Sequence, residues 1–469
     1  MIALSQVSNA VAGQLRDNEN TRVKGVSINT RADCDERLFV ALNGENFDAH
    51  EFVAQAEQAG ATALMVEREV ASELPTVLVN DTHQALSQMA GWWRAQFDIP
   101  VVGVTGSVGK TSVKEMLGCI FAQLGQGVVT QGNLNNEIGV PLTLMRLTAD
   151  DQYAVVEMGM NHAGEISRIT NMAKPTIALI NNAAAAHLEG LGTISAVADA
   201  KAEIFEGLSE NGVAIINNDD EFAPRWKASV AKYKTLTFSL KQTPELNSNA
   251  DVSASYQLNK DSLVLQVSAL GKSFDLRLSS VGEHSARNAL AAITTAIAAN
   301  VSIDDIKAGL EAYQPISGRL NLLEVGQSLL IDDTYNANPL SMLAAIKVLT
   351  QYDDNTLVVG DMAELGDGVE LEHKKLGQAA AEHGINRVLA CGQYAQLVID
   401  AFNDARGSNS SAGHAFASQA ELIEYAITHI VSGAVLVKGS RSAKMEHVVS
   451  ALNESLSTLL DSNGSNRGC

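Results

Sequence analysis

The chain has 469 residues and a formal net charge of −21, from 54 Asp and Glu against 33 Lys and Arg. At roughly 100 to 200 residues per domain, this length predicts about three domains, each able to bury a hydrophobic core. The acidic balance argues against a nucleic-acid binder, because binding to a phosphate backbone needs clustered Lys and Arg.

Export and membrane insertion are not indicated either. No apolar run reaches the roughly 18 residues that span a bilayer, and the amino terminus lacks a basic segment followed by an apolar one. The four cysteines are scattered, which is typical of free thiols in a reducing compartment. We therefore expect a cytoplasmic monomer that has no membrane span and binds small molecules rather than nucleic acid.

The first predicted domain, residues 1–98, is a small α/β unit. Helical stretches at 50–58 and 84–97 alternate with short strand-like runs at 38–42, 63–66 and 77–79. Pro100 interrupts the helical pattern where the next apolar run, 99–104, begins. This change of pattern predicts the first domain boundary.

The second predicted domain, residues 99–315, contains a parallel sheet with an antiparallel flank. Near-continuous apolar runs, typical of strands buried on both faces, lie at 153–158, 176–180 and 213–216. Between 234 and 281 the pattern changes to alternation of apolar and polar residues, which predicts antiparallel strands. A helix is predicted over 285–299.

The third predicted domain, residues 316–469, is Rossmann-like. Helical stretches separate strand-like runs at 329–332, 357–360, 388–391 and 435–437. This alternation predicts an open parallel sheet with helices on both faces. The predicted fold class of the whole chain is therefore α/β with three domains.

A phosphate-binding loop is predicted between an apolar strand and an amphipathic helix whose apolar stripe runs from Val113 to Leu124. Backbone amides at the start of the helix can hold phosphates, Lys110 can reach the β and γ phosphates, and the Thr111 hydroxyl can ligate magnesium. Val104 stands where the common pattern has its first glycine. The predicted ATP-binding residues here are Thr105, Gly106, Ser107, Val108, Gly109, Lys110, Thr111 and Ser112.

Three further side chains are weighed as catalytic or metal-binding. Glu157 ends an apolar run, so its carboxylate would lie at the sheet edge beside the phosphate loop and could bind magnesium. The alternative is a structural ion pair with a nearby cation. His187 alone is typical of a hydrogen-bonded loop histidine. Lys201, in a helical stretch at 197–205, taken alone is typical of a solvated helix face.

Taken together, the chain resembles the Mur ligase family over nearly its whole length. Six blocks occur in the family's order, at 106–111, 132–141, 187–190, 333–338, 360–366 and 437–442. The first domain is similar to the family's uridine-nucleotide holder. Ala49 and Ala202 depart from the pattern, since the family usually has glycine at both places.

The resemblance implies roles that the residues alone do not establish. Glu157 and His187 would bind magnesium beside Thr111, and Lys201 would be carbamylated and join them; Lys110, Glu157, His187 and Lys201 would be catalytic. Asn288 would meet the adenine, with a helix cap as the alternative, and Arg319 would reach the nucleotide, with a surface charge as the alternative. The other implied ATP contacts are Asp333, Tyr335 and Asn336, and the implied substrate contacts are Ser27, Thr30, Arg31, Asn43, Gly44, Asn133, Asn135 and Asn136.

The block at 360–366 is of the kind found in the dipeptide-adding branch of the family, and the Asn-Pro-Arg motif that selects diaminopimelate is absent. This implies an ATP- and Mg²⁺-dependent ligase that joins UDP-N-acetylmuramoyl-tripeptide to D-alanyl-D-alanine through an acyl phosphate, giving the pentapeptide precursor of peptidoglycan. One alternative is another amide ligase, such as the folylpolyglutamate type, which lacks the first domain. A nucleotide switch is a second alternative, but the guanine-specific Asn-Lys-x-Asp element is absent.

Overall fold

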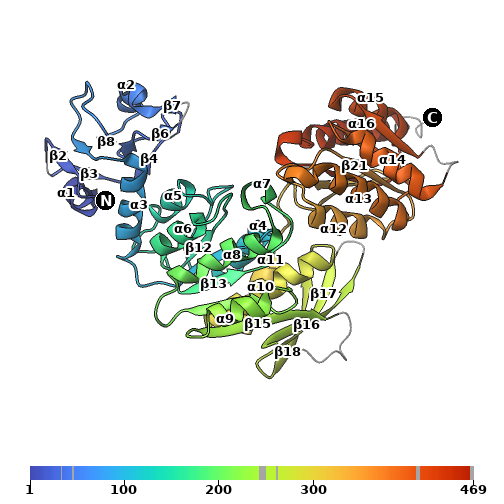
Figure 1. The fold of residues 1–469 in the computed structure, drawn as a ribbon, viewed down its shortest axis with the longest axis horizontal. Coiled ribbons are helices and arrows are strands. Elements are labelled where there is room, and N and C mark those ends of the chain that lie inside the picture. Colours follow the sequence, from blue (N-terminus) through green and yellow to red (C-terminus); the bar gives the residue numbers. More distant parts are fainter. Residues whose placement is uncertain are drawn as a thin grey trace.

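The computed structural model describes residues 1–469 except 19, 33, 45–46, 242–249, 260–261, 408–411 and 465–469. The chain forms three lobes, and the central lobe lies between the other two (Figure 1). Each of the three large sheets lies inside one of the predicted ranges 1–98, 99–315 and 316–469. The predicted three-domain α/β class is confirmed, while the two boundaries stay predictions.

The first lobe is built on a small sheet with short helices. Its sheet strands are β2 (Gln14–Arg16), β4 (Val26–Ser27), β5 (Leu38–Val40), β8 (Ala63–Val66) and β9 (Thr76–Leu78). They are ordered β2-β9-β8-β5-β4, and the β2–β9 pair is antiparallel. Two short pairs are β1 (Ile2–Ala3) with β3 (Arg22–Val23) and β6 (Asn43–Gly44) with β7 (Phe47–Asp48). The helices are α1 (Leu4–Ala10), η1 (Ala49–Phe52), α2 (Val53–Gln58) and α3 (Thr82–Arg94).

The central lobe has a nine-stranded sheet. Its strands are β10 (Val101–Thr105), β11 (Val128–Val129), β12 (Ala154–Glu157), β13 (Ile177–Ile180), β14 (Val213–Asn217), β15 (Lys234–Lys241), β16 (Val252–Leu258), β17 (Leu263–Ala269) and β18 (Lys272–Leu278). Their order is β11-β12-β10-β13-β14-β15-β16-β17-β18. The helices are α4 (Lys110–Phe121), α5 (Gly139–Leu144), α6 (Glu165–Ala173), α7 (Leu188–Leu191), α8 (Ile194–Ala202), η2 (Glu203–Gly207), α9 (Ala223–Ser229), α10 (Glu283–Ala298) and α11 (Ile303–Ala312).

The antiparallel flank is shorter than predicted. Strands β15 and β16 continue the parallel sheet, and only the β16–β17 and β17–β18 pairs are antiparallel. Helix α9 connects β14 to β15, and such a crossover returns the chain in the same direction. Leu124 is a second correction, because α4 ends at Phe121 and leaves Leu124 46% exposed.

Helices cover both faces of the central sheet, as the apolar strands predicted. The hydrophobic core on one face includes residues of α4, α10 and α11, and the core on the other face includes residues of α5, α6 and α8. Along β10, Val102 and Val104 join one core and Val101 joins the other. The carboxyl ends of the strands are thereby left as the open edge on which a site can form.

The first lobe is fused to the central lobe through α3. Met89 of α3 and Ile169 of α6 belong to one continuous hydrophobic core. Buried Arg94, at the end of α3, donates to the carbonyl oxygens of Ala173 at 3.0 Å and Lys174 at 3.2 Å. These bonds satisfy carbonyls that the end of α6 leaves without helical partners.

The third lobe has the predicted open parallel sheet. Its strands are β19 (Asn321–Val325), β20 (Ser328–Asp333), β21 (Asn355–Val359), β22 (Arg387–Cys391), β23 (Gly413–Phe416) and β24 (Gly433–Lys438). Their order is β19-β20-β24-β21-β22-β23, with β19 as an antiparallel edge. The helices are α12 (Pro339–Leu349), η3 (Gly366–Gly368), α13 (Val369–Glu382), α14 (Ala395–Arg406), α15 (Gln419–His429), η4 (Arg441–Ala443) and α16 (Glu446–Gly464). The last strand, β24, thus inserts between β20 and β21, which makes this point a topological switch.

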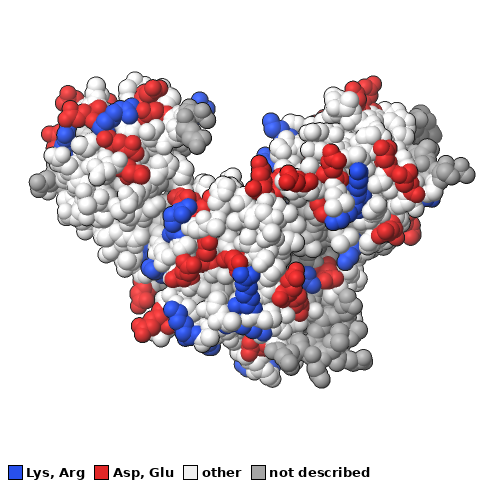
Figure 2. All heavy atoms as spheres, in the orientation of Figure 1, with Lys and Arg blue, Asp and Glu red and all other residues white. Residues whose placement is uncertain are grey.

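In the part of the chain that the structure describes, no helix combines the length and the apolarity that crossing a membrane requires. Figure 2 shows Asp and Glu side chains spread over the visible face of all three lobes, in keeping with the net charge of −21.

Candidate active site

A cavity of about 650 Å³, here called the junction cleft, lies between the central and third lobes. It is lined by the phosphate loop, the end of β12, the start of α10 and the ends of β20 and β24. Most of the predicted site residues line it, namely Ser107, Val108, Gly109, Lys110, Thr111, Ser112, Asn133, Asn135, Asn136, Glu157, His187, Asn288, Arg319, Asp333, Tyr335 and Asn336.

The phosphate loop has the predicted strand, turn and helix. Gly109 adopts a left-handed φ of 81° directly before α4. A Cβ there would lie 2.3 Å from Asn288 Oδ1 and 2.6 Å from Asn181 Nδ2, so the position has no room for a side chain. Lys110 Nζ donates to the Gly106 carbonyl at 2.6 Å, which holds the ammonium over the loop.

The loop is braced from the end of β13 by residues that sequence reasoning missed. Asn182 Oδ1 accepts from the Val108 amide at 2.9 Å, and Asn181 Nδ2 donates to the Val108 carbonyl at 3.0 Å. Ser107 Oγ donates to the Ala184 carbonyl at 3.1 Å. The signal for the two asparagines is their place directly after an apolar run, where polar side chains reach the sheet edge.

Glu157 is the last residue of β12 and is 2% exposed. Its Oε1 accepts from Asn135 Nδ2 at 2.7 Å, while its Oε2 is buried without a hydrogen-bond partner in the described part of the chain. Burial lowers the pKa of Lys110, and the nearby Glu157 carboxylate opposes that shift. A buried carboxylate oxygen without a partner is costly, so this atom marks a place for a cation.

His187 contacts the third lobe. Its Nδ1 lies 2.8 Å from Oε2 of Glu364, in the loop after β21. The neighbouring His187 imidazole lowers the pKa of Glu364, against the effect of burial. Both residues have left-handed φ angles, 55° and 63°, which non-glycine residues adopt at a cost and which cluster at functional sites. Glu364 was missed as a site residue, although it lies in the block at 360–366.

Lys201 is fully buried in α8, so the interpretation as a solvated helix face is wrong. Its Nζ lies 3.7 Å from the sulfur of Met160, a residue that lines the junction cleft. Burial holds the pKa of Lys201 well below its usual range, and Lys110 adds to the shift. Burial therefore stabilises the neutral amine relative to the ammonium, in comparison with an exposed lysine.

The structure disagrees with the two purely structural interpretations, a surface charge for Arg319 and a helix cap for Asn288. Arg319 Nη2 donates to Thr111 Oγ1 at 2.8 Å, and its guanidinium lies 4.0 Å from the centre of the Tyr335 ring, so Arg319 is no simple surface charge. Asn288 lies inside α10 and not at its cap, and its Oδ1 accepts from Asn181 Nδ2 at 2.9 Å.

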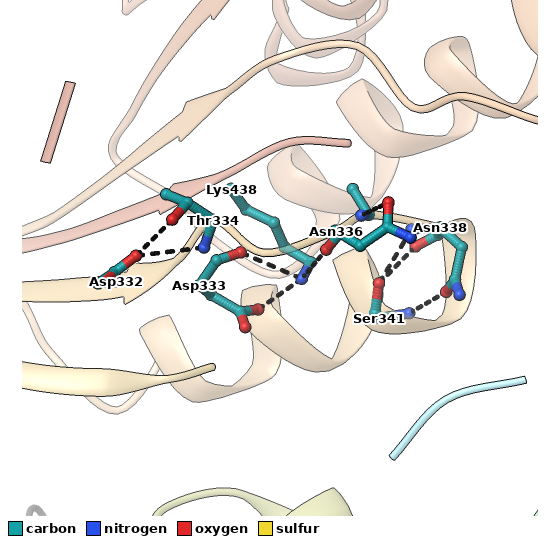
Figure 3. Close-up of polar contacts among 8 residues, drawn as sticks. Asp332, Asp333, Thr334, Asn336, Asn338, Ser341 and Lys438 are labelled. Atoms are coloured by element: carbon teal, nitrogen blue, oxygen red, sulfur yellow. Dashed lines mark hydrogen bonds and ion pairs between the residues drawn. The ribbon is translucent and has the colours of Figure 1, made fainter. Parts of the chain in front are cut away.

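The end of β20 meets the end of β24 on the wall of the junction cleft (Figure 3). Asp333 Oδ2 lies 2.6 Å from Nζ of Lys438, and Asn336 offers its carbonyl to the same ammonium at 2.9 Å. Burial raises the pKa of Asp333, and Lys438 opposes the rise. Lys438 was missed as a site residue, although the block at 437–442 contains it.

The predicted residues of the first lobe lie outside the junction cleft. Ser27 is buried and donates to the Asn29 carbonyl at 3.2 Å, while Arg31 is exposed and Thr30 lies beside Gln55. Asn43 and Gly44 form the exposed strand β6. Two residues of the phosphate loop, Thr105 and Gly106, also do not line the cleft. The substrate roles of the first-lobe residues stay predictions.

Comparison with known proteins assigns the chain to a family. A family model described as "Mur ligase middle domain" matches residues 104–296, and one described as "Mur ligase, glutamate ligase domain" matches residues 318–441.

Relatives match over the full length. The chain is 42% identical to the UDP-N-acetylmuramoyl-tripeptide–D-alanyl-D-alanine ligase of Escherichia coli (strain K12), over 97% of this chain and 98% of the relative. It is similar to a crystal structure of MurF from Acinetobacter baumannii, with a TM-score of 0.89, 36% identity and coverage of 97% and 99%. It also matches a MurF ligase from Thermotoga maritima solved in complex with ADP, with a TM-score of 0.79, 26% identity and coverage of 93% and 98%. The chain therefore belongs to the Mur ligase family.

Proposed function

We propose that this protein is an ATP-dependent ligase that joins the terminal carboxylate of a UDP-N-acetylmuramoyl-tripeptide to the amine of D-alanyl-D-alanine. The observation that carries the proposal is the junction cleft, in which the phosphate loop and residues of the third lobe converge. The full-length likeness to ligases of that name supports the choice of substrates.

The reaction begins when a carboxylate oxygen of the tripeptide attacks the γ-phosphorus of ATP. The bond from that phosphorus to the ADP oxygen breaks, ADP leaves, and an acyl phosphate forms. The dipeptide amine then attacks the activated carbonyl carbon, and the tetrahedral intermediate expels phosphate. The nitrogen loses a proton as the amide forms. Direct formation of an amide from a carboxylate is unfavourable in water, because the carboxylate has no good leaving group. Phosphorylation supplies one.

The chain's own groups would stabilise the charge on the transferred phosphoryl group. Lys110 and the start of α4 line the junction cleft from the central lobe, and Arg319 lines it from the third lobe, so these groups would face the phosphoryl group. Such preorganised charge is usually the largest contribution to phosphoryl transfer. Closure of the two lobes around the cleft would keep water away from the acyl phosphate.

The residues fit a magnesium site. Glu157 Oε2 is buried without a hydrogen-bond partner among the described residues, and the Thr111 hydroxyl and His187 imidazole line the same cleft. In the described ranges, no group of three His, Cys, Asp or Glu side chains forms a metal-binding site by itself. Oxygens of phosphate and water would therefore complete the set of magnesium ligands. When bound, magnesium would supply positive charge beside the phosphates.

Lys201 would join this site after carbamylation. Burial lowers the pKa of Lys201 and so favours the neutral amine, whose lone pair can add carbon dioxide, giving a carbamate and releasing a proton. Lys201→Ala is expected to abolish turnover. Its affinity for the nucleotide, measured by calorimetry, should stay close to that of the wild-type protein. Restoring carbon dioxide to a depleted assay should raise turnover; near-normal turnover of Lys201→Ala would remove this residue from the site.

Phosphate release tests the assignment. Purified protein is incubated with ATP and Mg²⁺, with and without each acceptor, and the amide product is followed by mass spectrometry. Phosphate release should require both the muramoyl tripeptide and D-alanyl-D-alanine, and tripeptides ending in diaminopimelate or lysine can be compared directly. Release with a folate and glutamate instead would favour the folylpolyglutamate type. Release independent of any acceptor would favour a nucleotide switch.

We further propose that the protein is a cytoplasmic monomer. The scattered cysteines support a reducing compartment. Light scattering on the purified chain should give the mass of one copy, about 49.6 kDa.

A further inference from the structure

Lys438 is a buried cation on the wall of the junction cleft. The residue is 2% exposed, and its Nζ lies within reach of three oxygens: Asp333 Oδ2 at 2.6 Å, the Asn336 carbonyl at 2.9 Å and the Asp333 carbonyl at 3.4 Å (Figure 3). A buried ammonium is costly unless its hydrogen bonds are satisfied.

The order of the strands in the third-lobe sheet determines where the Lys438 ammonium lies. In β24, Lys438 is in register with Asp333 of β20 on one side and with Val359 of β21 on the other. The insertion of β24 between the two strands therefore brings together residues 105 positions apart. Both lie at the carboxyl edge, where ligands bind in open parallel sheets.

Other groups already hold the two ends of the loop that Lys438 contacts. At one end, Asp332 accepts from Thr334 Oγ1 at 2.6 Å and from the Gly318 amide at 2.9 Å. At the other end, Asn338 Oδ1 accepts from the Ser341 amide at 2.9 Å and caps α12. Lys438 contacts the part between these ends.

That middle part leads to the phosphate loop. Lys438 holds Asp333 and Asn336, which flank Tyr335, and the guanidinium of Arg319 lies over the Tyr335 ring. Arg319 in turn donates to Thr111 of the phosphate loop. A shift of the 333–336 loop would therefore move Tyr335 and, through the contact with its ring, Arg319.

We propose that Lys438 is a positioning residue for the nucleotide, which acts by holding the Asp333 carboxylate and the Asn336 peptide in place. This inference rests on the proposed function, because it takes Asp333, Tyr335 and Asn336 to be the third lobe's contacts to ATP. Direct contact of Lys438 with phosphate is disfavoured, since an ammonium has three donors and three oxygens lie around this one.

Lys438→Met tests the inference, because methionine keeps the unbranched stem and removes the charge. The variant loses the hydrogen bonds of a charged group, so we expect the Kd of ATP and its KM to rise at least about tenfold. The KM of the muramoyl tripeptide should change by less than about twofold, a split that a general loss of structure would not give. Lys438→Arg keeps the charge and should restore part of the ATP affinity.

The matched control is Lys375→Met, in the same lobe. Lys375 is exposed on α13 and pairs with Glu372 at 2.7 Å. This variant should bind ATP like the unmodified chain, because it loses the same type of side chain away from the junction cleft.

A double-mutant cycle separates positioning from a purely structural role. If Lys438 acts through Asp333, then Asp333→Asn combined with Lys438→Met should weaken ATP binding little more than the larger single change. Additive effects, or equal rises in the KM of ATP and of the tripeptide, would overturn the inference. If Lys438→Met does not fold, Lys438→Gln decides, because glutamine keeps a hydrogen-bond donor and removes the charge: an unchanged ATP affinity in Lys438→Gln would also overturn the inference.

Failure of this inference can be told from failure of the proposed function. An unmodified chain whose phosphate release does not require both acceptors contradicts the proposed function. An unmodified chain that passes that test, with a Lys438→Met variant that binds ATP normally, contradicts only the role of Lys438.

Discussion

Arg319 reaches across the junction of two lobes to donate a hydrogen bond to Thr111, with 2.8 Å between Nη2 and Oγ1. The residues are 208 positions apart in the chain. The hydroxyl that is predicted to ligate magnesium is thus held here by a cation of the opposite lobe. Binding of ATP with magnesium has to rearrange this contact, which couples the phosphate loop to the third lobe.

Replacement of Arg319 should therefore weaken nucleotide binding. Arg319→Ala removes a guanidinium that lines the junction cleft beside the phosphate loop and would pair with the phosphates of ATP, so we expect the Kd of ATP to rise at least about tenfold. Arg319→Lys should recover little, because an ammonium lacks the planar fork of the guanidinium. Calorimetry with ADP and ATP measures this; full recovery in Arg319→Lys would show that charge alone suffices.

Glu157→Gln should separate charge from shape. Glutamine can keep an oxygen for the bond from Asn135, but it offers magnesium a neutral amide in place of a carboxylate. Turnover should fall by a factor of about 100 or more, with a higher magnesium concentration needed for half-maximal rate. A magnesium titration of phosphate release checks this, and an unchanged titration curve would exclude Glu157 as a ligand.

Gly109→Ala should disrupt the phosphate loop. A left-handed φ costs a non-glycine residue about 1–2 kcal/mol, and the new Cβ would also meet Asn288 and Asn181. We expect a lower melting temperature and loss of ATP binding. Gly368→Ala is the control, because its Cβ would meet nothing within 4 Å and its φ of −83° suits alanine. Normal ATP binding by Gly109→Ala would contradict this account of the loop.

The partly buried imidazole of His284, which lines the junction cleft, should make the stability of the fold depend on pH. Loss of contact with water, helped by the charges of Lys438 and Arg287, lowers the pKa of His284 from its usual 6.5 to about 4. Between these values the unfolded chain binds a proton that the folded chain does not, so stability falls as pH falls from 6.5 towards 4.

Thermal melting between pH 7 and pH 5 measures this effect. His284→Asn should lose less stability over the range than the unmodified chain, by up to about 1.4 kcal/mol per pH unit. His383→Asn, which replaces an exposed histidine, should follow the unmodified chain. Parallel curves for all three proteins would show that His284 does not titrate in this way.

Local patterns predicted most of the secondary structure. The apolar runs at 176–180 and 213–216 correspond to β13 and β14, and the helix predicted over 285–299 corresponds to α10. These elements could be predicted because the spacing of apolar residues is a local pattern, readable within each short stretch of sequence. The predicted antiparallel direction of β15 was wrong. Whether two strands pair in parallel depends on the segment that connects them and not on the alternation of residues within a strand.

Burial of single polar residues was harder to predict. Lys201 lies in a helix of small residues, and the pattern around it does not show which face packs inward. Its burial comes from the packing of α8, itself part of the central lobe, against hydrophobic residues that distant parts of the chain contribute.

The sequence by itself determined the α/β class, the phosphate loop and the six blocks of the Mur ligase family, because each of these is a pattern of neighbouring residues. Only the tertiary structure decided which distant side chains meet: Arg319 with Thr111, Glu364 with His187, and Lys438 with Asp333. Those contacts depend on the order of strands in a sheet and on how two lobes pack, and no short stretch of sequence encodes either.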